Sequence, residues 1–311
     1  MADPATLLPL LLLAPALVLA AGLAAAAGAV TAGDRPSAPA VETLRLLAKQ
    51  RRRTPADDPF LGRIGLTVLP VGAVLALAVV PLGLPGHRGA PVDLDVGIVW
   101  FNAMEVLAWF AVWTAGWGPN AVTALVGGYR VLPLGLAYEL PHMLAIITPA
   151  IAAGSLDPAD VAAAQHGLWY AVWMPVAFLL YLVSTAAMAF WGPFAAPLGR
   201  DLAGGAGAEH AGLDRLLLRA GRWMLLVAAA AMAVPLFLGG GAPPPITGPD
   251  PFGGPAWAWI VVKLLVVLAV LLGLRRVMPV LRMERVATLA WTVLIPLAVA
   301  QALVVTVVVL V

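Results

Sequence analysis

The chain has 311 residues, of which 62% are hydrophobic and only 11% charged, and its mean hydropathy is +0.97. Soluble domains carry about 25% charged residues, so this composition excludes a soluble enzyme, a disordered chain and a nucleic-acid-binding protein. The absence of cysteine excludes disulfides, zinc–thiolate sites and cysteine-ligated iron–sulfur clusters within the chain. The four histidines are scattered without the spacing of a metal site. The composition predicts an all-α polytopic membrane protein in which residues 1–311 form a single integral membrane domain.

Eight apolar runs are long enough to cross a membrane as helices. A helix needs roughly 20 mostly apolar residues to cross a hydrocarbon core of ~30 Å. The first run could instead be a signal peptide, but it lacks a basic amino-terminal region and its apolar stretch is too long. We therefore predict eight transmembrane helices, near residues 6–30, 61–83, 97–118, 131–153, 168–190, 222–240, 256–274 and 286–310.

Basic residues are concentrated in alternate loops. Sixteen of the eighteen lysines and arginines fall in or at the edges of the loops 31–60, 119–130, 191–221 and 275–285. Because Lys and Arg favour the cytoplasmic side, these loops are predicted to be cytoplasmic and both termini to lie outside. The outer loop 239–255 is a Gly- and Pro-rich coil. His87, in an outer loop, and His166, at the mouth of a span, are predicted to be interfacial residues.

The first cytoplasmic loop contains a predicted amphipathic helix, PAVETLRLLAKQ (39–50). Its apolar positions 41, 44, 47 and 48 fall on one helical face, whereas Glu42, Arg45 and Lys49 fall on the other. This pattern is typical of a short helix lying on the cytoplasmic membrane interface. A solvated linker is the alternative.

Glu105, Glu139 and Lys263 lie inside predicted spans. An ionisable group there costs at least ~2.5 kcal/mol, which makes each of the three a candidate functional residue facing the bundle interior. Each glutamate lies roughly 12 Å into its span at 1.5 Å per residue, Glu139 from the cytoplasmic side and Glu105 from the outside, so the two could approach one another in depth. The structural alternatives are that Glu139 pairs with Arg130 or Lys263 to lock helices together, and that Lys263 snorkels.

The surroundings of Glu139 are unusually polar for a membrane span. Tyr138 precedes it, and His142 lies one turn further on the same helical face. Pro141 removes a backbone hydrogen bond and bends the helix beside the acid. We predict that burial lets either glutamate, Glu139 or Glu105, accept and release protons near neutral pH.

Two stretches of the chain carry recognisable motifs, AGWGPNAVTALVGGYRVLPLGLAYELP (115–141) and residues 255–297. Both resemble the membrane-embedded H subunit of NADH-quinone oxidoreductase (respiratory complex I), a family shared with membrane subunits of formate hydrogenlyase and membrane-bound hydrogenases. Eight helices with both ends outside are also the topology of that family. The residues shared with the family include Ala115, Gly116, Trp117, Asn120, Gly127, Arg130, Tyr138, Glu139, Pro141, Lys263, Arg275, Pro279, Arg282, Trp291 and Pro296.

The chain also departs from the family pattern. GDRPSAP (33–39) replaces the family's GPNRVGP motif, and the third cytoplasmic loop has lost most of its acids. Asp201 is the nearest carboxylate that remains there, and Glu209 survives. Glu105 stands where typical subunits have a small polar residue. These departures indicate a divergent paralogue, from a reduced complex without the NADH module.

The resemblance implies that the chain docks a peripheral redox arm, forms much of a quinone tunnel and links quinone reduction to proton pumping. Glu139, Glu105 and Lys263 are then the proton-coupling residues. The expected partners are the iron–sulfur and hydrophilic subunits of the redox arm, antiporter-like and small membrane subunits, quinone and the lipid bilayer of a bacterial plasma membrane. Quinone is a shared substrate, and no covalent cofactor or metal is expected. The residues expected at the quinone and redox-arm interface are Arg130, Tyr138, Glu42, Arg45, Asp201, Glu209, Arg275 and Arg282.

Two other functions remain open from the sequence. The chain could anchor a formate hydrogenlyase or an energy-converting hydrogenase, which the loss of the acidic loop favours. It could also be a stand-alone ion transporter, but the internal repeats typical of transporters are not visible.

Overall fold

The computed structural model describes residues 4–83, 89–244 and 254–310, and every regular element in these ranges is helical. Seven helical segments are long and apolar enough to cross a membrane. The prediction of an all-α, multi-pass membrane protein is therefore confirmed. The seven segments are Pro9–Thr31 of α1 (Pro4–Thr31), α3 (Pro59–Ala78), α4 (Gly97–Trp117), α5 (Val122–Ala153), α9 (Leu213–Phe237), α10 (Ala256–Val277) and the continuous run Met283–Leu310.

The last of these runs contains a change of helix type. It consists of α11 (Met283–Leu289), a π-helical turn η7 (Ala290–Leu294) and α12 (Ile295–Leu310). Pro296 is the second residue after the turn and lacks the backbone N–H that a regular α-helix would use. The π turn accommodates this missing donor without ending the helix.

The predicted span 168–190 is not one continuous helix. It contains α7 (Tyr170–Trp173) and α8 (Pro175–Met188), and Met174 between them has a non-helical φ of −125° and ψ of 63°. Pro175 explains the break, because the residue before a proline is disfavoured in the α region. The 14 residues of α8 rise about 21 Å at 1.5 Å per residue. Among the described residues, the structure therefore has seven spans of full length and one interrupted segment, not eight continuous helices.

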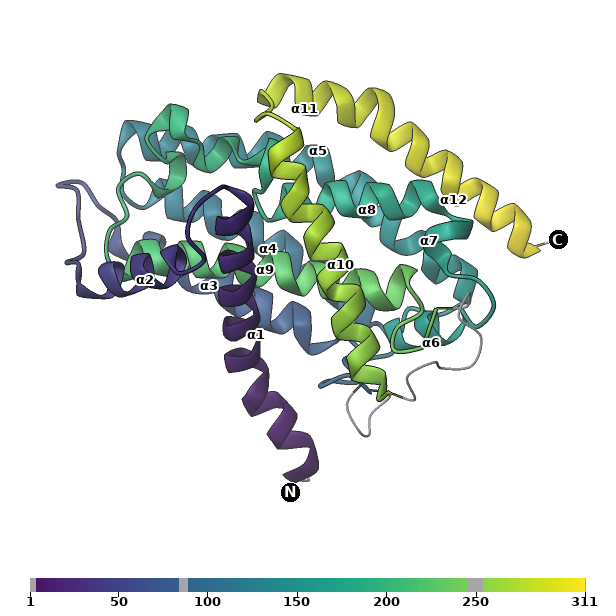
Figure 1. Ribbon diagram of the computed structural model, residues 1–311. Coiled ribbons are helices and arrows are strands. Elements are labelled where there is room, and N and C mark those ends of the chain that lie inside the picture. The colour runs from purple at the N-terminus through teal and green to yellow at the C-terminus, as the bar shows by residue number, and fades with distance from the viewer. Residues whose placement is uncertain (1–3, 84–88, 245–253, 311) are drawn as a thin grey trace.

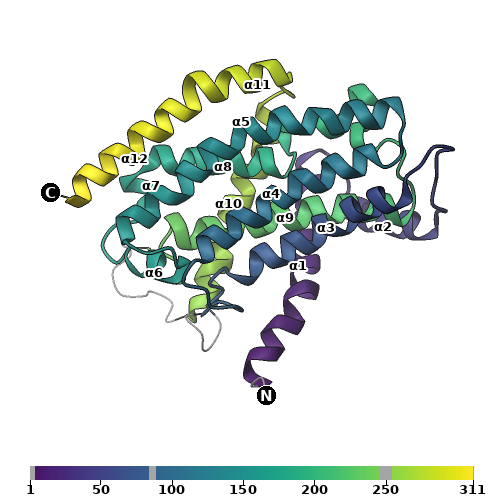
Figure 2. The ribbon, with the colours of Figure 1, turned by 180° about the vertical axis from the view of Figure 1, so that it is seen from behind.

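The core is a bundle in which α3 packs on α4 and α9, α4 packs on α5, and α5 packs on α8. The helix α9 runs through the middle, and 83% of its most apolar window is buried. Its alanine run 228–231 permits close approach of the neighbouring helices. In Figure 1, α1 and α10 lie steeply across one face of this bundle, and Figure 2 shows α4 and α5 on the opposite face.

The run α11–α12 lies along α5 and α8 at the edge of the bundle (Figure 1). Only 11% of its most apolar window is buried, and the corresponding value for α1 is 22%. Both helices therefore present long apolar faces outward, as expected for contact with lipid or with other membrane subunits.

Most of the short elements gather at the end of the bundle where α9 begins. They are α2 (Ala38–Ala48) and the 3₁₀ turns η2 (Gly192–Phe194), η3 (Ala196–Leu198), η4 (Arg200–Leu202) and η5 (Gly205–Gly207). The helix α6 (Pro158–Ala163) lies at the opposite end (Figure 2). A close backbone approach fixes the 3₁₀ loop on α5: a Cβ added at Gly127 would lie 2.1 Å from the amide nitrogen of Ala206.

Two helices begin at other residues than the predicted spans, because polar residues at their starts have contacts within the protein. The helix α5 begins at Val122, well before the predicted start at 131, because its first turns extend beyond the apolar run and pack on the 3₁₀ loop. The helix α3 begins after Asp58, whose carboxylate accepts hydrogen bonds from the amides of Phe60 and Leu61. His87, the loop residue Arg88 and residues 245–253 of the predicted outer coil lie outside the described residues.

A helix, α2, occupies the place of the predicted amphipathic segment. Leu46 is its buried residue and points toward the protein, whereas Val41, Leu44 and Leu47 are exposed. The apolar face recognised in the sequence is thus turned away from the bundle.

Candidate functional site

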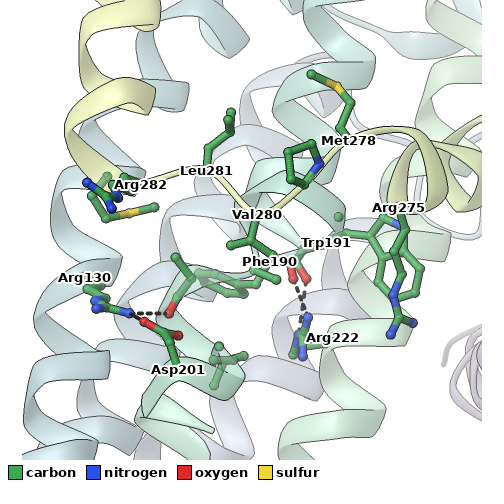
Figure 3. A pocket seen from close by; sticks show the side chains of 18 of the residues that line it. Arg130, Phe190, Trp191, Asp201, Arg222, Arg275, Met278, Val280, Leu281 and Arg282 are labelled. Carbon is green, nitrogen blue, oxygen red and sulfur yellow. Dashed lines mark hydrogen bonds and ion pairs between the residues drawn. The ribbon is translucent and has the colours of Figure 1, made fainter. Parts of the chain in front are cut away.

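A cavity of about 1340 Å³ opens at the end of the bundle that carries the 3₁₀ turns. Its walls come from the first half of α5, the loop 189–201, the start of α9 and the segment 275–284 (Figure 3). The loop and the last segment are tied together, because the amide of Leu281 donates to the carbonyl of Pro193 at 2.8 Å. Stretches that are far apart in the sequence thus enclose one space.

The charges lining the cavity are mostly positive. Arg130 donates to the carboxylate of Asp201 at 2.6 Å and to the carbonyl of Ala196 at 3.3 Å, which holds its guanidinium against the 3₁₀ loop (Figure 3). The only acidic residues in the lining are Asp201 and Glu284, within the described chain. The arginines of the lining are Arg130, Arg219, Arg222, Arg275 and Arg282.

Arg222 supports the loop from the α9 side. Its guanidinium donates to the carbonyl of Ala189 at 3.3 Å and to the carbonyl of Phe190 (Figure 3). Phe190 has a φ of +52°, an uncommon value for a residue with a side chain, where the chain leaves α8 and turns into the loop. The arginine satisfies carbonyls that the end of α8 leaves without helical partners.

An aromatic wall adjoins these arginines. The rings of Trp191 and Trp223 lie 4.6 Å apart, and the guanidinium of Arg275 lies 5.3 Å from the centre of the Trp191 ring. The indole of Trp191 donates to the carbonyl of Leu271 at 2.8 Å, which fixes the ring on α10. Flat apolar walls with nearby cationic donors suit a planar ring that carries polar oxygens.

Glu42 connects α2 to the wall of this cavity. One carboxylate oxygen pairs with Arg45 at 2.8 Å, and the other pairs with Arg219 of α9 at 3.2 Å. Glu209 is paired at 3.1 Å with Arg52, which joins the first and third predicted cytoplasmic loops. Separate ion pairs thus hold Glu42, Arg45 and Glu209 at the end of the molecule that carries the cavity.

A polar cluster formed by Asn102, Glu105, Tyr138, Glu139 and His142 lies between α4 and α5. Glu105 and His142 are fully buried, with 2.7 Å between Oε2 and Nε2. The amide of Asn102 donates to Glu139 at 3.4 Å, and Glu139 is half-buried. The two glutamates belong to one cluster, because Asn102 and Glu105 lie one turn apart on α4 and contact Glu139 and His142, which lie one turn apart on α5.

The polar cluster continues onto α8. The rings of His142 and Tyr181 lie 5.1 Å apart, and the Tyr181 hydroxyl donates to the carbonyl of Ala229 at 2.7 Å. Ser184 and Thr185 are buried nearby on the same helix. Several buried polar atoms have no hydrogen-bond partner among the described residues: Asn102 Oδ1, Glu105 Oε1, Tyr138 Oη, Glu139 Oε2, His142 Nδ1, Ser184 Oγ and Thr185 Oγ1.

Lys263 is buried on α10, where backbone carbonyls bind it. Its ammonium group donates to the carbonyls of Leu238 at 2.6 Å, Gly240 at 2.7 Å and Ala242 at 2.6 Å, and lies 4.7 Å from the centre of the Trp169 ring. These carbonyls follow the carboxyl end of α9, where a cation is favoured by the helix dipole. The structure therefore does not bring Lys263 to either glutamate, and neither Arg130 nor Lys263 pairs with Glu139.

The predicted site residues fall into two groups. The first group lines the cavity and consists of Arg130, Asp201, Arg275 and Arg282, with ion pairs of Glu42, Arg45 and Glu209 beside it. The second group belongs to the polar cluster and consists of Tyr138, Glu139 and Glu105. The two sites also contain residues that were not predicted from the sequence: Trp191, Arg222, Trp223 and His142. For His142 the signal was its position one turn from Glu139, and for Arg222 its position at the start of a span.

The fold and the two sites define a multi-pass helical membrane protein with an arginine-lined cavity at one end and buried carboxylates in the bundle behind it. The family model described as NADH dehydrogenase matches residues 10–306. The chain belongs to this family, that of the H subunit of NADH-quinone oxidoreductase.

Similar proteins support the assignment over most of the chain. The NADH-quinone oxidoreductase H subunit numbered 2 in Geobacter sulfurreducens is 33% identical over 267 residues, which cover 84% of this chain and 79% of the relative. The H subunit numbered 1 in Geobacter metallireducens is 32% identical over 273 residues, covering 86% and 80%. The H subunit of Geobacillus kaustophilus is 30% identical over 258 residues, covering 83% and 75%.

Proposed function

We propose that this chain is the membrane subunit of a complex I-like NADH-quinone oxidoreductase, in which it forms the quinone site and couples quinone reduction to proton translocation. The observation that carries the proposal is the cavity between the loop 189–201, α9 and the segment 275–284, with its arginines and aromatic wall. The family membership and the names of the relatives agree with it.

The cavity fits the chemistry of a quinone head group. Reduction of a quinone takes two electrons and two protons, so negative charge develops on its oxygens before the protons arrive. Arg275, stacked on Trp191, offers a cation next to a flat apolar surface, and developing charge is stabilised by such preorganised donors. The electrons come from an iron–sulfur subunit of the redox arm, since the chain has no cysteine to hold a cluster.

The basic end of the bundle is the proposed docking surface for the hydrophilic subunits of the redox arm. In the membrane, α7 and α8 together act as the eighth span, so that both termini lie outside and the basic end faces the cytoplasm of a bacterial cell. The outward face of α2, with Val41, Leu44 and Leu47, rests on the cytoplasmic membrane interface. The exposed faces of α1 and α12 contact lipid or the antiporter-like and small membrane subunits.

Proton coupling is assigned to Glu139 and Glu105. Both lie in a cluster in which several buried polar atoms lack protein partners among the described residues, and such atoms are ordinarily satisfied by water. A hydrated cluster allows a carboxylate to take up and pass on protons. Lys263, held on carbonyls, is assigned a structural role instead.

The test of the quinone site uses the purified complex reconstituted in lipid vesicles. Arg275→Met should raise the KM for quinone and lower the turnover with quinone, because the developing negative charge loses its nearest stacked cation. Arg285→Met is the matched control, since Arg285 lies nearby at the start of α11 but not in the cavity lining. Equal quinone kinetics in both variants would contradict the placement of the quinone.

The same preparation separates the two other functions. A complex that evolves or consumes hydrogen and ignores quinone would establish the hydrogenase anchor. Transport by the isolated chain, without partner subunits, would establish a transporter.

Proton coupling and topology are tested independently. Glu139→Gln should leave the complex assembled on native gels but lower the protons moved per electron pair, because an amide cannot carry a proton. Unchanged coupling in the assembled variant would leave Glu139 a structural role only. Reporter fusions after residues 54, 90, 205 and 247 should alternate in, out, in, out, and export of a reporter at 54 or 205 would overturn the orientation.

A further inference from the structure

His142 is buried on α5 and faces a carboxylate on another helix. Its Nε2 lies 2.7 Å from Oε2 of Glu105 on α4, and neither side chain is exposed to solvent. The two residues are 37 positions apart, so only the packing of α4 on α5 brings them together. The titratable groups that face the pair are Glu139 and Tyr138 on α5 and Tyr181 on α8.

The remaining atoms of the pair are not used in structural contacts. Glu105 Oε1 and His142 Nδ1 have no hydrogen-bond partner among the described residues. A buried ion pair that serves only to lock helices needs its outer atoms satisfied by the protein, because an unsatisfied buried charge is costly. Here one atom on each side of the pair is left for water or for a proton donor.

The surroundings provide a route toward and away from the pair. Glu139 lies one turn before His142 on the same face of α5, and its Oε2 is also without a protein partner in the described chain. Ser184 and Thr185 of α8 add two buried hydroxyls without partners there. The helices α9 and α12 bring no charged side chain to this region: α9 contributes a backbone carbonyl to Tyr181, and α12 (Ile295–Leu310) has no ionisable residue.

We propose that His142 is a proton-relay residue that, together with Glu105, extends the proton path beyond Glu139; this rests on the proposed coupling function. Glu139 gives up a proton through water to Nδ1 and is left as a carboxylate. As the Nδ1–H bond forms, the Nε2–H bond breaks and Oε2 of Glu105 gains that proton. The imidazole ends neutral with its hydrogen on Nδ1, and Glu105 ends as a neutral acid. Histidine suits this role because each ring nitrogen can gain a proton while the other loses one.

The test compares His142→Gln, Glu105→Gln and the double variant in the reconstituted complex. Glutamine at 142 keeps polarity and hydrogen bonding but cannot relay a proton. We expect His142→Gln to retain electron transfer to the acceptor and to lose proton translocation, because an amide cannot pass a proton from one atom to another. The double variant should be no worse than either single one, because residues that act as a unit are non-additive.

Thr148→Val is the matched control, since Thr148 is a buried polar residue of α5 whose hydroxyl donates only within its own helix, to Leu144 at 2.6 Å. It should translocate protons like the unmodified complex. Full translocation in His142→Gln or in the double variant would overturn the relay. Failure of the unmodified complex to move protons would instead overturn the proposed function.

The unmodified complex supplies a measurement that does not depend on the folding of any variant. Infrared difference spectra recorded during turnover, with isotope-labelled histidine, should contain an imidazole band that changes together with a protonated carboxyl band. A turnover spectrum without any imidazole change would overturn the proposal.

Discussion

The contacts of Lys263 predict that Lys263→Met destabilises the end of the bundle where α9 ends and leaves proton coupling intact. The ammonium group donates to three carbonyls at 2.6, 2.7 and 2.6 Å. Hydrogen bonds to a charged group contribute about 1.5–3 kcal/mol each, which sets a gross value of about 4.5–9 kcal/mol for three. Burying the ammonium group offsets several kcal/mol of this.

We therefore expect a net loss of about 3 kcal/mol in the free energy of unfolding. For a large domain this corresponds to a fall of roughly 6–12 °C in the midpoint of thermal unfolding. The assay is the temperature at which the purified complex stops eluting as a single species in mild detergent. The ratio of protons moved to electrons transferred is measured below that temperature.

Lys49→Met is the matched control, because Lys49 is the only other lysine of the chain and its side chain is exposed. The control should keep the thermal midpoint of the unmodified complex. An unchanged midpoint together with reduced proton coupling in Lys263→Met would refute the reasoning and return this lysine to the coupling machinery.

The remaining predictions concern the basic end of the bundle and the end where α9 ends. Gly127→Ala should displace the 3₁₀ loop, because the added Cβ would meet the Ala206 amide at 2.1 Å. Overpacking of this kind costs about 1–3 kcal/mol. The displacement should lower the quinone reductase activity of the assembled complex. Equal activity would contradict the close approach. Glu42→Gln should weaken the hold of α2 on α9 by less than about 1 kcal/mol and raise protease cleavage in α2; unchanged cleavage would show that the carboxylate does not hold the helix. Gln165→Leu should lower the thermal midpoint, since this buried amide accepts from Tyr170 and Gly239 and donates to three carbonyls; the same midpoint would contradict this.

Composition and periodicity predicted the helical membrane fold and most of its spans, because apolar runs of sufficient length can satisfy their backbone in lipid only as helices. The motif around Glu139 was sufficient to indicate the family that the comparison confirms. Pro175 also indicates the helix break from the sequence alone. One long span was predicted nevertheless, because the apolar run continues across the proline.

The partners of the buried polar groups were decided by the tertiary structure alone. The sequence predicted that Lys263 and the two glutamates lie inside spans. It did not predict that Lys263 donates to carbonyls beyond the end of α9 or that Glu105 contacts His142. Similarly, no local pattern in the loop 189–201 indicates that Arg222 and Arg130 enclose it with Trp191 to form a cavity.

The physical reason is that helix formation and burial depend on neighbours along the chain, whereas contacts between helices depend on how whole helices cross and rotate. A sequence states which faces are apolar and which residues are too costly to leave in lipid. The packing of α4, α5, α8 and α9 decides which polar groups become partners. Small residues at the helix interfaces fix the distance and rotation of each helix.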